Sequence, residues 1–299
     1  PGSVFANCTT QFSKGVPRVA EISGMADHCD FVEQNAVTAE EGERGSLVFV
    51  GLGLDDERGM TLRGLEEAKA ADLVFAEFYT SALRQGSIER LEAVLGKPIK
   101  VLGRRDVEDA QVILDACRGN KVVLLVAGDP MAATTHVDLR IRAHSAGAST
   151  SVIHGPSVFT SAAGLLGLQH YKFGRTTTLP FPQEGYSPTS PYDVVCENVS
   201  RHLHTLVLLD IDSENSRYMT ANEGLRLLME MEKRVGRGVL TADTVVAVVA
   251  RAGSDDAVVK AGPLSRLIDT EFGPPLHSIV VPGKLHFMEE EALKTFAGL

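Results

Sequence analysis

The residues best placed to do chemistry lie in a short loop, Gly128-Asp129-Pro130. Before it, Lys121–Val126 is an apolar run after its first residue and contains three β-branched valines, which is typical of a strand covered on both faces. After it, Val137–Ala143 predicts a helix. In such a unit of a parallel sheet, the loop lies at the carboxyl end of the strand, where open α/β sheets bind ligands. Asp129 therefore either contacts a ligand or only stabilises a tight turn.

Two further strands end in loops of small residues. Leu47–Val50 is followed by Gly51–Leu54, and Thr150–Ile153 is followed by His154 and Gly155–Ser157. Because the carboxyl ends of parallel strands meet at one edge of a sheet, these loops and Gly128–Ala132 are expected to share one cleft.

The loops lack the features of a phosphate-binding site. Gly51-Leu52-Gly53 has no third glycine at the spacing of a dinucleotide fingerprint, and Asp55 and Asp56 would repel a pyrophosphate. The sequence also contains neither a phosphate-loop lysine motif nor a serine nucleophile elbow. We expect a ligand without phosphates, and not NAD.

Composition narrows the classes of protein. The chain has 299 residues and a formal net charge of −10, which argues against a general nucleic-acid binder. No apolar run reaches the roughly 18–20 residues of a membrane span. Its four cysteines form no CxxC pair and its histidines no HExxH motif, so we expect no metal. Cysteines without a disulfide or metal spacing favour reduced thiols and a cytoplasmic location.

Alternating strands and helices predict an α/β fold with two domains. Residues 46–160 are expected to form a mostly parallel sheet with flanking helices, and residues 161–299 a mixed sheet with helices. Residues 1–45 form an acidic extension of uncertain order. The expected strands are 47–50, 73–78, 99–102, 121–126, 150–153, 174–180, 205–209, 245–250, 258–262 and 277–281. The expected helices are 61–71, 88–95, 107–116, 137–143, 192–201, 221–235 and 288–296.

From Leu47 to Leu299 the chain resembles the diphthine synthase family, a branch of the tetrapyrrole methylase (class III) group of S-adenosylmethionine-dependent methyltransferases. Gly128-Asp129-Pro130 marks the wider group. The motifs specific to the branch are Ala133–His136, Tyr171–Gly174 and Arg217–Thr220.

The resemblance implies S-adenosylmethionine as cofactor, S-adenosylhomocysteine as product, and a homodimer with the cofactor in a cleft between the two domains. The cofactor contacts that it implies are Leu54, Asp129, Ala132, Ser157, Val158, Leu209, Ala252 and His277. The implied substrate is translation elongation factor 2, in which a histidine carries an aminocarboxypropyl group that is methylated on its amine. The segment between Ile211 and Arg217 is short, as in the archaeal form, whose product is the trimethylated amine.

Roles beyond cofactor binding stay open. Lys172 and Arg175 are candidates for binding a substrate carboxylate, and either could equally be a solvated surface charge. No catalytic residue is assigned to His136 or His154, and no buried histidine–carboxylate pair is expected in the cleft loops. Two alternative functions remain: a methylase of the same fold acting on a tetrapyrrole or another small molecule, and a non-catalytic module that binds the cofactor.

Overall fold

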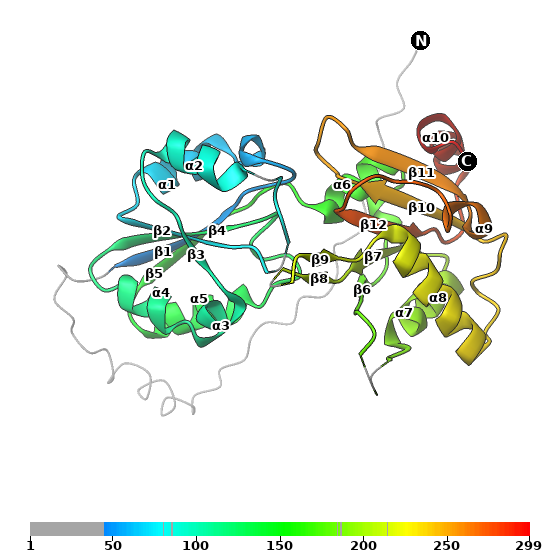
Figure 1. Ribbon diagram of the computed structural model, residues 1–299, viewed down its shortest axis with the longest axis horizontal. Helices are drawn as coiled ribbons and strands as arrows, with labels where there is room; N and C mark the ends of the chain where they lie inside the picture. Colours follow the sequence, from blue (N-terminus) through cyan, green and yellow to red (C-terminus); the bar gives the residue numbers. More distant parts are fainter. Residues whose placement is uncertain (1–44, 80, 85, 184, 186, 214) are drawn as a thin grey trace, which may run out of the picture. The chain divides into compact units, whose positions relative to one another are not determined.

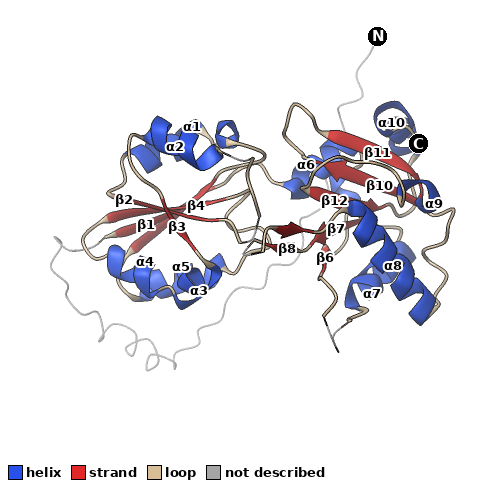
Figure 2. Cartoon of the chain, viewed as in Figure 1, coloured by secondary structure: helices blue, strands red, loops and turns tan. Residues whose placement is uncertain are grey.

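The computed structural model describes residues 45–79, 81–84, 86–183, 185, 187–213 and 215–299. They form two five-stranded sheets flanked by helices, drawn in Figures 1 and 2, and this confirms the α/β fold class. The strands are β1 (Ser46–Gly51), β2 (Leu73–Glu77), β3 (Lys100–Leu102), β4 (Lys121–Val126), β5 (Ser149–Ile153), β6 (Thr177–Leu179), β7 (Thr205–Leu209), β8 (Ile211–Asp212), β9 (Arg217–Tyr218), β10 (Val245–Ala250), β11 (Val258–Pro263) and β12 (His277–Val281). The α-helices are α1 (Leu62–Lys69), α2 (Ser87–Leu95), α3 (Arg104–Asp109), α4 (Gln111–Ala116), α5 (His136–Ser145), α6 (Val158–Leu166), α7 (Ser190–Ser200), α8 (Ala221–Val235), α9 (Leu264–Leu267) and α10 (Phe287–Ala297).

The first sheet is parallel throughout, with the strand order β3-β2-β4-β1-β5. Alternate residues of β4 face opposite sides of it. Leu124 packs with α3, α4 and α5 on one face, and Leu125 packs with α1 and α2 on the other. Both side chains are fully buried. Burial on both faces explains the uninterrupted apolar run by which the sequence predicted this strand.

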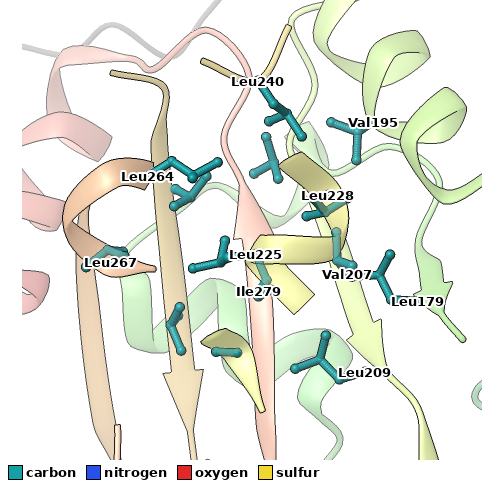
Figure 3. Close-up of a cluster of buried hydrophobic side chains, with 14 of the residues drawn as sticks. Leu179, Val195, Val207, Leu209, Leu225, Leu228, Leu240, Leu264, Leu267 and Ile279 are labelled. Atoms are coloured by element: carbon teal, nitrogen blue, oxygen red, sulfur yellow. The ribbon is translucent and has the colours of Figure 1, made fainter. Parts of the chain in front are cut away.

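The second sheet is mixed, as predicted, with the order β11-β10-β12-β7-β6. Only the β6–β7 pair is parallel among its four neighbouring pairs. One face packs against α7, α8 and α9 through Leu225, Leu228 and Leu264, shown in Figure 3. The other face packs against α6 and α10 through Leu166 and Leu293.

Two sequence predictions of secondary structure were wrong. The helix expected over 107–116 is two helices, because Ala110 takes a left-handed conformation with φ 64°. Val107 and Ile113 would lie about 120° apart around a continuous helix. With the break, both are buried in the same core. The strand expected over 174–180 is shorter, since Gly174 and Arg175 instead bond to the His204 carbonyl and the Asn198 amide.

The expected domain boundary, after residue 160, lies in helix α6 (Val158–Leu166). Its small and apolar sequence carries no charged face that could have revealed a helix. The division into two domains there stays a prediction. The extension up to Arg44, with Cys8 and Cys29, lies outside the described residues. Within the described part, no helix is long and apolar enough to span a membrane.

A buried carboxylate, Glu289, ties the last helix to the second sheet. Its side chain is only 1% exposed. It accepts hydrogen bonds from the backbone N–H groups of Gln169 (2.9 Å) and His286 (2.8 Å) and from His204 Nε2 (3.0 Å), and it pairs with Lys172. Burial alone would raise the pKa of Glu289, but these donors outweigh it and lower the pKa to about 2.

Replacing Glu289 by Gln removes this anchor. A carboxylate whose pKa is depressed stabilises the fold above its unfolded pKa of about 4.5, and loses that contribution as the pH falls towards 2. We expect Glu289→Gln to lower the free energy of unfolding by about 3 kcal/mol at pH 7 and to flatten its pH dependence between 4.5 and 2. Urea unfolding at several pH values measures both effects.

Glu290→Gln is the matched control, because Glu290 lies on the same helix in a half-exposed pair with Lys294. Solvent screens that exposed pair, so its loss should change the free energy of unfolding far less than the loss of Glu289. Equal losses from the two variants would contradict the assigned role of Glu289.

Candidate functional site

The three glycine-rich loops meet, as the sequence predicted, at the ends of neighbouring strands β4, β1 and β5. Gly53 and Gly128 exchange backbone hydrogen bonds of 3.1 and 2.8 Å. A Cβ atom on Gly51 would lie 2.6 Å from the Gly128 oxygen and 2.6 Å from the Gly155 nitrogen. Only a residue without a side chain allows these backbones to approach so closely.

A cavity of ≈ 770 Å³ opens at these loops. Its lining includes residues that follow β1, β4 and β5 and residues from β7, β10 and the start of β12. The eight residues predicted from the sequence to bind a cofactor all line it: Leu54, Asp129, Ala132, Ser157, Val158, Leu209, Ala252 and His277. Its size is that of a small-molecule site, and many of the lining side chains are small or apolar.

The two candidates for substrate binding lie elsewhere. Lys172 pairs with Glu289 and donates to the Lys284 carbonyl (2.8 Å), and Arg175 forms an ion pair with Glu197 (3.1 Å). Neither residue belongs to the lining of the cavity. A role in substrate binding stays a prediction for both.

Asp129 makes two contacts with its own loops. Its Oδ1 accepts from the backbone N–H of Met131 (2.9 Å), and its Oδ2 accepts from His154 Nδ1 (2.7 Å). The first contact is the tight turn that the sequence allowed. The turn therefore exists, and it also fixes the carboxylate of Asp129 at the cavity wall.

His277, which also belongs to the lining, is held in one orientation. Its Nδ1 accepts from the backbone N–H of Ala221 (3.1 Å), so Nε2 carries the proton and donates to the Pro274 carbonyl (3.0 Å). Burial lowers the pKa of His277. The ring is therefore neutral and has no free nitrogen with which to take a proton.

The expectation of no buried histidine–carboxylate pair was wrong at His136. This residue follows the Gly128–Ala132 loop, is fully buried, and has its Nε2 3.7 Å from Glu77 Oε1. Its Nδ1 donates to the Pro130 carbonyl (2.9 Å) and so holds the loop. Neither His136 nor Glu77 lines the cavity.

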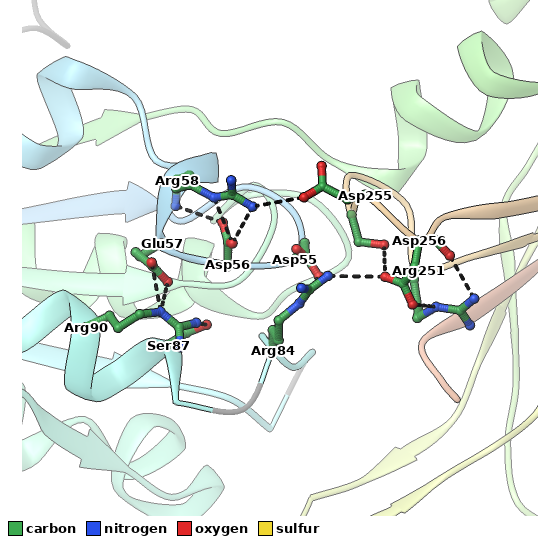
Figure 4. Close-up of polar contacts among 11 residues, drawn as sticks. Asp55, Asp56, Glu57, Arg58, Arg84, Ser87, Arg90, Arg251, Asp255 and Asp256 are labelled. Atoms are coloured by element: carbon green, nitrogen blue, oxygen red, sulfur yellow. Dashed lines mark hydrogen bonds and ion pairs between the residues drawn. The ribbon is translucent and has the colours of Figure 1, made fainter. Parts of the chain in front are cut away.

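An ion-pair network beside the cavity was not predicted. Arg84 contacts Asp55 (3.1 Å) and Asp256 (3.2 Å), and Arg251 contacts Asp256 (2.8 Å), as Figure 4 shows. Arg58 contacts Asp56 (2.9 Å) and reaches Asp255 at 3.8 Å. The Ser254 hydroxyl and the Arg251 guanidinium hold the pKa of Asp256 below its usual value. Pairs such as Arg84 and Asp256 lie 172 residues apart, so no local pattern could reveal them.

The cavity offers little to a phosphate group. Among the described residues that line it, the cationic side chains are Arg84 and Arg251, and both are already paired with Asp256. In the described part of the chain, no group of three His, Cys, Asp or Glu residues could hold a metal ion. The arrangement suits an uncharged or zwitterionic ligand with apolar surface.

Comparisons with known proteins agree on one family. The model of the tetrapyrrole (corrin/porphyrin) methylases matches residues 46–268. A diphthine synthase of Methanocaldococcus jannaschii is 51% identical over 251 residues, which cover 83% of this chain and 97% of the relative. One of Methanothermobacter thermautotrophicus is 45% identical over 252 residues, covering 84% and 96%.

Solved structures give the same result. A crystal structure of a diphthine synthase aligns with a TM-score of 0.77 at 38% identity, covering 84% of this chain and 96% of that one. A putative diphthine synthase from Entamoeba histolytica aligns with a TM-score of 0.78 at 37% identity, covering 85% and 98%.

Replacing Gly51 by Ala tests the contact among the three loops. The added methyl group meets backbone atoms at 2.6 Å, so the loops must move apart. We expect Gly51→Ala to lower the free energy of unfolding by about 1–3 kcal/mol and to weaken ligand binding in the cavity. Thermal melting and ligand titration measure the two effects.

Gly164→Ala is the control, since a Cβ at this position in α6 would meet nothing within 4 Å. Alanine is the better helix former, so this variant should gain about 0.5–1 kcal/mol. If Gly51→Ala keeps the stability and ligand affinity of the wild type, the close contact among the loops is not required.

Proposed function

This chain belongs to the tetrapyrrole methylase family and, within it, to the diphthine synthases, and we propose that it methylates the modified histidine of translation elongation factor 2. The methyl donor is S-adenosylmethionine. The acceptor is the amino group of the aminocarboxypropyl chain that this histidine carries. One observation carries the proposal: the eight residues predicted to bind the cofactor line a single cavity.

The lining of this cavity fits the methyl donor. Leu54, Val158 and Leu209 offer apolar surface to an adenosine, and Gly128 leaves its backbone open with φ 73°. Asp129 offers a carboxylate to a hydroxyl or amine of the ligand. The bound cofactor supplies an electrophilic methyl group on a sulfonium. These residues bind and orient it and keep water away from the methyl group.

Positioning is the main task of the chain in this reaction. Methyl transfer is an in-line displacement, so holding the amine against the methyl group accounts for much of the rate. The amine must be neutral, and an α-amino group has an ordinary pKa of about 7.7–8.0, so a fraction is neutral at pH 7. Desolvation in the cavity lowers that pKa further.

The histidines near the cavity support this mechanism without a dedicated base. His277 uses both ring nitrogens in hydrogen bonds. His154 donates its Nδ1 proton to Asp129, but its side chain is 72% exposed and it is not part of the lining. Neither histidine therefore offers a free, buried nitrogen to take a released proton.

A short hairpin beside the cavity bears on the number of methyl groups. Strands β8 and β9 pair Ile211 with Tyr218, and both residues line the cavity. Because the connection between them is short, as the resemblance implies for the archaeal form, we propose the trimethylated amine as the product.

Mass spectrometry of elongation factor 2 tests this function. We expect incubation with the protein and S-adenosylmethionine to add three methyl groups to the aminocarboxypropyl-histidine and none to an unmodified factor. Gly128→Val should abolish the transfer, because its side chain would enter the cavity wall from a left-handed backbone.

Two outcomes would favour the alternatives. Methylation of a porphyrinogen, with none of elongation factor 2, would indicate a small-molecule methylase. Binding of S-adenosylmethionine without transfer to any acceptor would indicate a non-catalytic module.

We also propose a cytoplasmic homodimer. Elongation factor 2 acts in the cytoplasm, and exposed apolar surface is available for a second copy. Val137 and Ile141 lie one turn apart on α5 and are 53% and 60% exposed. Analytical ultracentrifugation should give the mass of two chains at micromolar concentration, and Ile141→Glu should lower it. A monomeric wild-type protein would overturn this proposal.

A further inference from the structure

A carboxylate oxygen of Asp55 is buried at the cavity wall without a partner. The side chain of Asp55 is 9% exposed, and the residue belongs to the cavity lining. Its Oδ1 accepts from Arg84 Nε at 3.1 Å, whereas Oδ2 has no hydrogen-bond partner among the described residues. Buried carboxylate oxygens nearly always accept hydrogen bonds. The unpartnered Oδ2 therefore indicates a ligand that brings a donor.

The backbone holds Asp55 and Arg84 together. The Asp55 carbonyl accepts from the Arg84 backbone N–H at 2.5 Å. Asp55 has a left-handed conformation with φ 68°, which is costly for a residue with a side chain and is frequent at functional sites. The pair is thus fixed by backbone geometry as well as by its ion pair, and Figure 4 shows the two side chains facing each other.

Arg84 can exchange one of its partners for a ligand. It contacts Asp256 at 3.2 Å, and Asp256 is 60% exposed. Asp256 has other donors, because its carboxylate also accepts from Arg251 Nε (2.8 Å) and the Ser254 hydroxyl (2.8 Å). Losing Arg84 therefore leaves Asp256 paired.

Arg251, the other cation of the lining, is not free in this way. Its side chain is 12% exposed, and it donates to the carbonyls of Phe272 and Pro274 (both 2.7 Å) as well as to Asp256. A carboxylate entering the cavity would therefore bind to Arg84.

We propose that Asp55 and Arg84 together recognise a 3-amino-3-carboxypropyl group, with Asp55 Oδ2 accepting from its amino nitrogen and the Arg84 guanidinium donating to its carboxylate. This proposal rests on the proposed function and extends it. The paired acid and base suit the zwitterion at the methionine end of the cofactor, whose two charges each meet a partner of opposite sign. On the acceptor, whose reacting amine is neutral, Asp55 Oδ2 would accept an amine N–H. The group occurs twice in the reaction, at the methionine end of the cofactor and on the acceptor histidine.

The test separates these two sources with a pair of ligands. S-adenosylhomocysteine carries the group, and 5′-methylthioadenosine has the same nucleoside thioether without it. Calorimetry measures both affinities for the wild type, Asp55→Asn, Arg84→Met and Arg84→Lys. Asp55→Asn conserves the size of the side chain. Arg84→Lys keeps the charge but loses the two-pronged geometry, and it serves if Arg84→Met fails to fold.

Arg58→Gln is the matched control, because Arg58 belongs to the same ion-pair network but not to the cavity lining. If the pair binds the cofactor, Asp55→Asn and Arg84→Met lower the affinity for S-adenosylhomocysteine about tenfold to a hundredfold. The affinity for 5′-methylthioadenosine stays unchanged. If the pair binds the acceptor, both affinities are unchanged and the KM for modified elongation factor 2 rises by a similar factor. The effect of Arg84→Lys is intermediate between wild type and Arg84→Met, and Arg58→Gln changes neither the affinities nor the KM.

Other outcomes overturn the assignment. Wild-type affinities and wild-type KM in Asp55→Asn and Arg84→Met would do so, as would an equal loss for both ligands, which indicates a collapsed cavity. If the wild type binds S-adenosylhomocysteine and modifies the factor, and Asp55→Asn and Arg84→Met do so equally well, only the role of the pair is overturned. A wild type that does neither would overturn the proposed function as well.

Discussion

The site depends on the close approach of three backbones that carry no side chains. Gly51 ends β1, and Gly128 and Gly155 follow the neighbouring strands β4 and β5. A methyl group on Gly51 or Gly155 would meet the Gly128 carbonyl oxygen at 2.6 Å, whereas Gly128 itself requires glycine through its left-handed φ of 73°. This contact fixes the spacing of the loops. It is also what sets Asp129, Ser157 and Leu54 around one cavity. The chemistry of the site thus begins with an absence of side chains at three positions.

Side chains then hold the loops from behind. His136 and Thr134 both donate to the Pro130 carbonyl, at 2.9 and 2.8 Å. His154 donates to Asp129, and Ser157 begins helix α6. In the second sheet, His277 is held by hydrogen bonds at both ring nitrogens, one of them to the first turn of α8. Residues at the cavity wall are therefore restrained before any ligand arrives, which reduces the entropy lost on binding.

Much of the framework followed from the sequence, since buried strands are long apolar runs. β7, β10 and β12 have the predicted bounds. Helix α6 was missed because its small and apolar residues include no charged face, and the break at Ala110 reflects tertiary packing that no local pattern contains. Glycine-rich strand ends predicted the cleft, whereas the individual cofactor contacts came from family resemblance. The Asp55–Arg84–Asp256 chain joins distant segments and became visible only in three dimensions.

The distribution of the cavity lining along the chain has a consequence for synthesis. Its walls include Gly53, which follows β1, and Ser278, which lies 225 residues later in β12. A ribosome adds about 5–20 residues per second, so most of the chain has emerged before the last wall residue exists. The complete cavity can therefore form only after Ser278 has been synthesised, when the residues of the first sheet have already left the ribosome. Once the cofactor binds, it protects the whole protein at once, because opening either sheet releases it.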